Sequence, residues 1–272
     1  MKYSVLMSVY KNDSPEHLSC ALKSVYEEQT KKPDEIVVVF DGPLTDELYH
    51  VLDDFRVDKP DIVRYYPQDV NRGLGVALRI GFEHCTGDYI FRMDSDDISA
   101  ANRFELQSAY VEAHPEIDVL GADIAEFWAD PSDSKRIRAC PPNHDEIVKM
   151  GKTRNPMNHV SVCMKKSAVE KSGGYESLLL LEDYYLWLKM IVAGCKLANI
   201  NESLVYVRIG NGFHEKRGSA VRIKGWKTLQ RYMVQHGLIG RFQSWKNMFY
   251  IRAFTYCPNW LRKIAYERFL RK

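Results

Sequence analysis

The chain has 272 residues, of which 45% are hydrophobic, 12% aromatic and 27% charged. These fractions are ordinary for a globular protein and exclude a disordered, collagen-like or low-complexity chain, while the length allows one large domain or two modest ones. The formal net charge of +2 hides an uneven distribution: residues 216–272 contain 14 Lys and Arg against the single acid Glu267, a net +13, and residues 1–215 carry −11. This asymmetry predicts two regions with different partners.

The N-terminal residues and the cysteines favour a cytoplasmic protein. Lys11, Asn12 and Asp13 follow the apolar residues 3–10 at once, so we expect a first buried strand rather than a signal peptide. No run reaches the roughly 18 apolar residues that a membrane-spanning helix needs. The six cysteines are scattered without metal-ligand spacing, which predicts reduced thiols.

Apolar runs of strand length alternate with helical patterns over the first 125 residues. We expect strands at residues 4–10, 35–40, 62–66, 89–93 and 117–124. Between them we expect helices at residues 14–26, 46–55, 73–85 and 100–114. The run at 35–40 is apolar on both faces, as in a parallel sheet that helices cover on both sides. The alternation therefore predicts an α/β fold of βαβ units, with ligands bound beyond the carboxyl ends of the strands.

The pattern changes after residue 130, where four prolines between residues 131 and 156 indicate looping. We expect a short strand at 161–164, then a mostly buried helix that begins near Glu182 and Asp183, then a strand at 205–209 that ends in a glycine-rich loop. From residue 220 onward, apolar and aromatic residues at helical spacing predict helices, and Pro258 separates the last of them.

Three carboxylates lie within four positions directly after the strand expected at 89–93: Asp94, Asp96 and Asp97. They could form a solvated loop in which Asp97 caps the next helix, because Asp is favoured at helix N-termini. Alternatively, three like charges that would otherwise repel one another share a hard divalent cation such as Mg²⁺ or Mn²⁺. On these residues alone both interpretations remain open.

Four segments, in order, resemble motifs of the inverting glycosyltransferases of family 2, which have the GT-A fold. They are residues 4–12, 37–42, 71–78 and 87–97, the last of which resembles the DxD signature. Residues 92–99, 102–104 and 115–121 are most similar to the amylovoran-biosynthesis type. The resemblance implies a Rossmann-like, mostly parallel central sheet flanked by helices, and the pattern from residue 220 onward predicts a helical basic C-terminal extension. The implied regions are a catalytic domain (1–219), made of a nucleotide-sugar half (1–125) and an acceptor half (126–219), and a basic amphipathic region (220–272).

The resemblance also implies roles for individual residues. Donor contacts are implied for Ser8, Tyr10, Asp41, Arg72, Asp94 and Ser95. Metal ligands are implied at Asp96, Asp94 and His214, although His214 could equally be an exposed loop residue. Asp183 is implied as the base, supported by Glu182. His159 and Arg217 are candidates for the acceptor or the phosphates, and His159 could equally be a structural histidine.

The function implied is metal-dependent, inverting transfer from a nucleotide-diphosphate sugar, UDP-linked, to a hydroxyl of a lipid-linked glycan in bacterial surface polysaccharide synthesis. The transferred sugar is expected to be a hexose or an N-acetylhexosamine. A nucleotide-sugar or nucleic-acid binding protein without transfer activity is the alternative, and it needs no base at Asp183. A dehydrogenase is disfavoured, because no G-x-G-x-x-G follows the first strand, and a nucleotidyltransferase would carry a basic glycine-rich loop there.

The basic C-terminal region interleaves aromatic residues with cations. This pattern suits an amphipathic helix at an anionic membrane surface, or nucleic-acid binding, or helices that simply pack on the catalytic domain. We expect a peripheral position on the cytoplasmic face of the inner membrane, and no nucleic acid.

Overall fold

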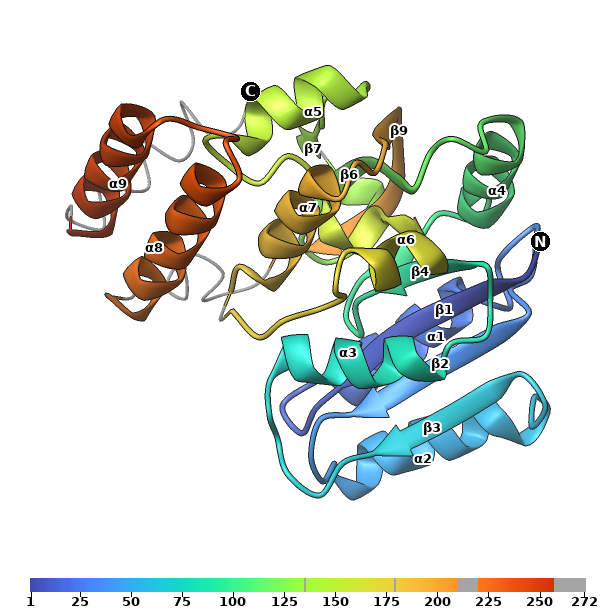
Figure 1. Cartoon of the computed structure of the whole chain (residues 1–272). Coiled ribbons are helices and arrows are strands. Elements are labelled where there is room, and N and C mark those ends of the chain that lie inside the picture. Colours follow the sequence, from blue (N-terminus) through green and yellow to red (C-terminus); the bar gives the residue numbers. More distant parts are fainter. Residues whose placement is uncertain (135, 179, 210–219, 257–272) are drawn as a thin grey trace.

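The central feature of the structure, a computed structural model that describes residues 1–134, 136–178, 180–209 and 220–256, is one mixed sheet between helices (Figure 1). Its strands lie in the order β3-β2-β1-β4-β8-β6-β9-β5, and β7 pairs with β6. Their bounds are β1 Tyr3–Val9, β2 Glu35–Phe40, β3 Val63–Pro67, β4 Tyr89–Met93, β5 Ile98–Ser99, β6 Val119–Phe127, β7 Arg136–Arg138, β8 Cys163–Lys165 and β9 Leu197–Arg208.

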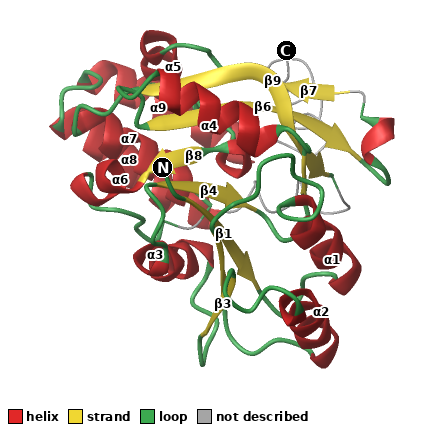
Figure 2. Ribbon diagram, turned by 90° about the vertical axis from the view of Figure 1, so that its right-hand side faces the viewer, coloured by secondary structure: helices red, strands yellow, loops and turns green. Residues whose placement is uncertain are grey.

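The first four strands form the parallel half of the sheet. Strand β1 pairs in parallel with β2 and β4, and β2 pairs in parallel with β3. Helices α1 (Pro15–Ser24) and α2 (Asp46–Val57) cover one face, and α3 (Leu74–His84) covers the other (Figure 2). Successive side chains of a strand point to opposite faces, so Val38 packs with the α1 and α2 side while Val37 and Val39 pack with α3. The βαβ units expected from the sequence are confirmed.

The remaining strands make the sheet mixed. Strand β8 lies antiparallel between β4 and β6, β9 is parallel to β6, and β5 is antiparallel to β9. The other short helices are α4 (Arg103–Ala113), η1 (Pro131–Asp133), α5 (His144–Gly151), η2 (His159–Ser161), α6 (Lys166–Lys171) and α7 (Glu182–Val192).

Several elements of this part differ from the sequence expectations. Strands β5 and β7, helices α5 and α6, and the first half of β9 were not expected, because they are short or polar. Asp97 does not cap a helix: β5 follows it directly, and α4 begins later, after Asn102. The N-cap interpretation of Asp97 is therefore wrong.

The C-terminal helices α8 (Ala220–Gln235) and α9 (Arg241–Tyr256) stack outward from α7. The ring of Trp226 on α8 contacts that of Tyr184 on α7 edge-on, with 5.6 Å between centroids. Helix α9 packs on α8, and Figure 1 shows α8 between α7 and α9. Within the described residues, no helix is long and apolar enough to cross a membrane. The last expected helix, after Pro258, lies outside them.

Candidate active site

The candidate site lies at the carboxyl edge of the parallel strands. Ser8 and Tyr10 lie at the end of β1, Asp41 directly follows β2, and Asp94 directly follows β4. Because neighbouring parallel strands end at the same edge of a sheet, these residues from three separate segments face one region.

The acidic cluster consists of Asp94, Asp96 and Asp97, whose nearest carboxylate oxygens all lie within 4.8 Å of one another. Asp97 is buried and accepts a hydrogen bond of 2.9 Å from the backbone N–H of Arg208. Asp96 is open to solvent. The Asp97 carboxylate is thus fixed to the backbone of β9, while Asp96 is exposed to solvent.

The electrostatics of this cluster suit a cation. Burial, with the charges of Asp94 and Asp96, raises the pKa of Asp97 well above its usual range. Desolvation by the surrounding protein, with the charges of Asp94 and Asp13, raises the pKa of Asp96 to about 6, although the residue remains accessible at the surface. Carboxylates that destabilise one another's ionised forms bind a hard divalent ion well, because the ion supplies the missing positive charge. The donor set therefore fits Mn²⁺ or Mg²⁺.

The loop after β1 is tied to the acidic cluster through Asp13. One oxygen of Asp13 accepts hydrogen bonds from the Ser95 hydroxyl, at 2.7 Å, and from the Tyr10 backbone N–H, at 3.1 Å. The structure thus brings together Tyr10 and Ser95, two of the predicted donor contacts, through Asp13, for which no role in the site was predicted.

Asp41 organises the entry to α3. Its two oxygens accept hydrogen bonds from the backbone N–H groups of Arg72, at 2.7 Å, and Gly73, at 3.0 Å. Gly42 next to it has φ of +89°, and a Cβ there would lie 2.7 Å from the backbone nitrogen of Asn71, so only glycine fits. The Asp41 carboxylate therefore holds Arg72, whose side chain is exposed, beside the strand ends.

The two acids of the predicted base motif begin α7. Burial raises the pKa of both Glu182 and Asp183. For Asp183 the backbone N–H of Tyr184 and a 2.5 Å hydrogen bond from the Asn155 side-chain amide oppose this rise. The Glu182 side chain lies against α3, since a Cβ at Gly75 would come within 2.7 Å of its Cγ. The predicted base motif thus contacts Gly75 on α3 through Glu182 and Asn155 through Asp183.

Arg92 supplies a buried positive charge to the acidic cluster. It is fully buried at the end of β4 and forms an ion pair with Asp94. Its positive charge also opposes the rise in the pKa of Asp183, as a smaller contribution than those of the Asn155 amide and Arg138. Its Nε and Nη1 atoms have no hydrogen-bond partner among the described residues. Sequence reasoning missed Arg92 as a site residue, although an arginine inside an otherwise apolar strand was the available signal.

His159 is hydrogen-bonded to a neighbouring tyrosine. Its Nε2 atom shares a 2.8 Å hydrogen bond with the Tyr175 hydroxyl. Burial and the positive charge of Arg92 hold the pKa of His159 well below its usual range. This geometry favours the structural interpretation of His159. Of the other predicted contacts, His214 and Arg217 lie outside the described residues.

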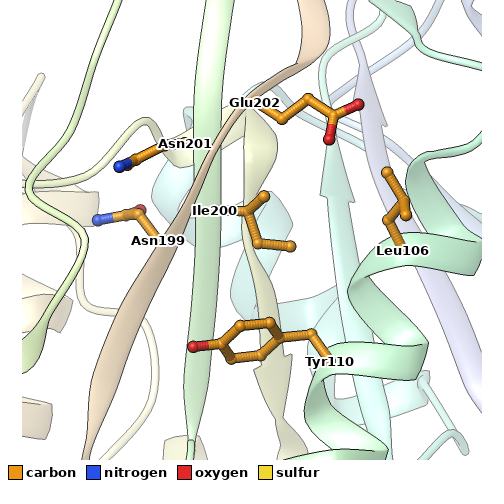
Figure 3. A pocket seen from close by; sticks show the side chains of 6 residues that line it. All are labelled: Leu106, Tyr110, Asn199, Ile200, Asn201 and Glu202. Atoms are coloured by element: carbon orange, nitrogen blue, oxygen red, sulfur yellow. The ribbon is translucent and has the colours of Figure 1, made fainter.

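A separate hollow lies between α4 and β9 (Figure 3). It shares no residue with the candidate site, and its lining is Leu106, Tyr110, Asn199, Ile200, Asn201 and Glu202.

Known protein sequences are similar to this chain over most of its length. The family model described as Glycosyl transferase family 2 matches residues 4–173. An uncharacterized glycosyltransferase of Haemophilus influenzae is 40% identical over 272 residues, covering 100% of both chains. The amylovoran biosynthesis glycosyltransferase AmsE of Erwinia amylovora is 37% identical over 84% of this chain and 82% of its own. An Escherichia coli protein named UDP-Gal:alpha-D-GlcNAc-diphosphoundecaprenol beta-1,3-galactosyltransferase is 38% identical over 80% of this chain and 78% of its own.

Solved structures share the fold. The S. aureus protein TarS, residues 1–349, in complex with UDP-GlcNAc, aligns with a TM-score of 0.70 at 15% identity, over 100% of this chain and 76% of that one. The Pyrobaculum calidifontis mannosyltransferase PcManGT, with GDP-Man and Mn²⁺, aligns with a TM-score of 0.63 at 17% identity, over 98% and 73%. The expected GT-A fold is confirmed.

Proposed function

Because the chain belongs to glycosyl transferase family 2 and is a glycosyltransferase, we propose that it transfers a sugar from a UDP-linked donor to a hydroxyl group of a lipid-linked glycan, with inversion at the anomeric carbon. The process proposed is the synthesis of a bacterial surface polysaccharide. Relatives named for amylovoran biosynthesis and for galactosyl transfer to a GlcNAc-diphosphoundecaprenol acceptor support this proposal. The alternative of a binding protein without transfer activity is at odds with these names.

The single observation that carries the proposal is the contact of Glu182, in the predicted base motif, with the start of α3, which Asp41 holds at the edge of the sheet where the acidic cluster follows β4. Arg92 adds positive charge at that edge through its ion pair with Asp94. Inverting transfer needs such an arrangement, with positive charge where the diphosphate leaves and one carboxylate where the acceptor enters.

In the proposed reaction, Asp183 accepts the proton of the acceptor hydroxyl as that oxygen bonds to the anomeric carbon. The bond from that carbon to the diphosphate oxygen breaks, and its electron pair leaves with the nucleoside diphosphate. Mn²⁺ or Mg²⁺ held by Asp94 and Asp96 would neutralise the charge that develops on the diphosphate. Asp41 and Ser8 would orient the nucleoside. The Asn155 side-chain amide would fix the orientation of the Asp183 carboxylate by donating a hydrogen bond to one of its oxygens.

A panel of nucleotide sugars, with and without Mn²⁺, tests the donor. We expect UDP-sugars with Mn²⁺ at about 100 times their Kd to raise the melting temperature by roughly 5 °C, because only the folded chain binds them. GDP- and ADP-sugars serve as matched controls. The donor that stabilises should then transfer its sugar to a GlcNAc-diphosphate lipid, with the opposite anomeric configuration in the product by NMR. Stabilisation by none of the panel, or a retained configuration, would contradict the proposal.

The hydrogen bond from Asn155 predicts a change in pH dependence. Asp183 must be ionised to accept a proton, burial raises its pKa, and the Asn155 amide lowers it by stabilising the ionised form. Asn155→Ala should therefore move the acid limb of the kcat/KM profile to higher pH. At pH values below that limb kcat/KM should fall about tenfold, the effect of one hydrogen bond to a charged group, and recover partly as the pH rises.

The Asp183→Asn background is the control for Asn155. There Asn155→Ala should leave the pH profile of the residual rate unchanged, because position 183 no longer carries a carboxylate for the Asn155 amide to stabilise. A uniform loss of activity at every pH, with a lowered melting temperature, would instead mean that Asn155 only supports the fold.

A further inference from the structure

Helix α9 presents an aromatic stripe to solvent. We use this name for Phe242, Trp245, Phe249 and Tyr256, which are 73%, 64%, 58% and 71% exposed. Their spacings of three, four and seven residues place them on one face of the helix. Neighbouring rings stack, with centroids 6.2 Å apart for Phe242 and Trp245 and 6.1 Å apart for Trp245 and Phe249. Elsewhere in the described chain the exposed large apolar residues lie singly on separate elements.

The opposite face of α9 is anchored to the catalytic domain. Asn247 is buried, and its side-chain amide donates to the Gln230 side chain on α8, at 3.1 Å, and to the backbone oxygen of Lys152, at 2.8 Å. Thr255, two turns further on the same side, is also buried. The packing interpretation of the C-terminal region thus accounts for the inner face of α9 and leaves the aromatic stripe facing outward.

Cations border the aromatic stripe on both sides. Arg241 and Arg252 are eleven positions apart, about three helical turns, so they share one edge, and Lys246 lies on the other. Residues 220–256 contain seven Lys and Arg and no acid. Among the described residues, no ion pair satisfies Arg241, Lys246 or Arg252. The face therefore combines apolar rings with uncompensated positive charge.

We propose that the aromatic stripe and its three bordering cations bind the surface of a bilayer that contains anionic phospholipid. Aromatic rings partition into the boundary between head groups and acyl chains, and Lys and Arg beside them attract the negative lipid surface. With 16 residues and three cations, α9 lies flat on the surface rather than across the bilayer. A protein partner is a less suitable occupant of this face than a lipid surface, because it would have to supply an apolar groove with an acidic rim around it.

This proposal extends the proposed function, because a lipid-linked acceptor lies at such a surface, yet its physical basis is independent of the donor and the reaction. The test accordingly uses the full chain without substrates. The chain is sedimented with sucrose-loaded vesicles of phosphatidylcholine alone, or with about 30% phosphatidylglycerol, at low and high salt. We expect binding to the anionic vesicles only, weakened by salt.

Two double variants locate the surface. Trp245→Ser with Phe249→Ser should lower the partition coefficient at least about tenfold, and Arg241→Gln with Arg252→Gln should lower it about 30-fold. Matched controls remove exposed groups elsewhere: Val57→Ser for an apolar side chain, and Lys23→Gln with Lys149→Gln for two charges. The controls should bind like the original chain, and all variants should keep its melting temperature, since every altered side chain is exposed.

Three outcomes would overturn the proposal. The first is unchanged binding by both double variants, and the second is equal binding to neutral and anionic vesicles. The third is a dimer in sedimentation velocity that the Trp245 and Phe249 double variant dissociates, without vesicle binding by the original chain, because the occupant of the stripe would then be a second copy. Loss of vesicle binding with donor stabilisation intact would leave the glycosyltransferase proposal standing.

Discussion

Asp183→Asn should lower kcat for sugar transfer by about 10³-fold or more while leaving the Kd of the UDP-sugar unchanged. The asparagine keeps the shape of the side chain and its contact with Asn155 but cannot accept a proton. Without that acceptor the attacking hydroxyl oxygen must bond to carbon while it still carries its proton. The measurements are single-turnover transfer and isothermal titration with the UDP-sugar.

The neighbouring acid gives the matched control. Glu182→Gln should reduce kcat far less than Asp183→Asn, because Glu182 lies against Gly75 on α3 and is assigned only a supporting role. If Glu182→Gln is the more damaging variant, the base is Glu182 and the assignment of Asp183 is wrong. Full turnover by both variants would remove the general base from this segment altogether.

Asp96→Asn should have the second large effect, at the other end of the site. We expect about a 10³-fold loss of transfer and the loss of Mn²⁺-dependent stabilisation by UDP, since the outward-facing carboxylate of the acidic cluster is the natural ligand for an ion that also binds diphosphate. In metal-free buffer the same variant should be at least as stable as the original chain. Removing one of three neighbouring carboxylates relieves their repulsion.

An exposed acid on α2, changed as Asp54→Asn, controls for the loss of one surface charge. It should alter neither transfer nor the response to Mn²⁺. A metal-dependent melting curve for Asp96→Asn that matches that of the original chain would show that the ion binds elsewhere, and the acidic cluster would then be only a loop at the end of β4.

Much of the parallel half was predictable because burial leaves a simple pattern. Strands β2 and β4 are buried on both faces, and their predicted bounds, 35–40 and 89–93, are those of the structure. Strands β5 and β7 have two and three residues, too few for any periodicity, so their tertiary partners determine them. The start of helix α5 could have been recognised in the sequence, because asparagine is a favoured N-cap residue. In the structure the Asn143 side chain accepts a hydrogen bond from the backbone N–H of Glu146.

The candidate site was predictable where its residues directly follow strands within motifs that resemble those of the family, as Asp41, Asp94 and Asp96 do. It was not predictable where function depends on contacts across the chain. Asn155 meets Asp183 over a sequence separation of 28 residues. Arg92 was visible as a charge within an apolar strand, but only the structure shows that it is buried and forms an ion pair with Asp94.

Strand β8 has a consequence for how the chain folds as it is synthesised. Strand β8 ends at Lys165 and lies between β4 and β6, so it is the pairing partner on one edge of each. Strand β4 ends much earlier in the chain, at Met93. A nascent chain that has emerged only as far as residue 125 has four parallel strands with an unpaired edge at β4, and that edge stays open until some 40 further residues emerge. Such long-range pairing is slow to form and exposes the edge in the meantime. The parallel half of the sheet therefore cannot reach its final form on the ribosome before β8 emerges.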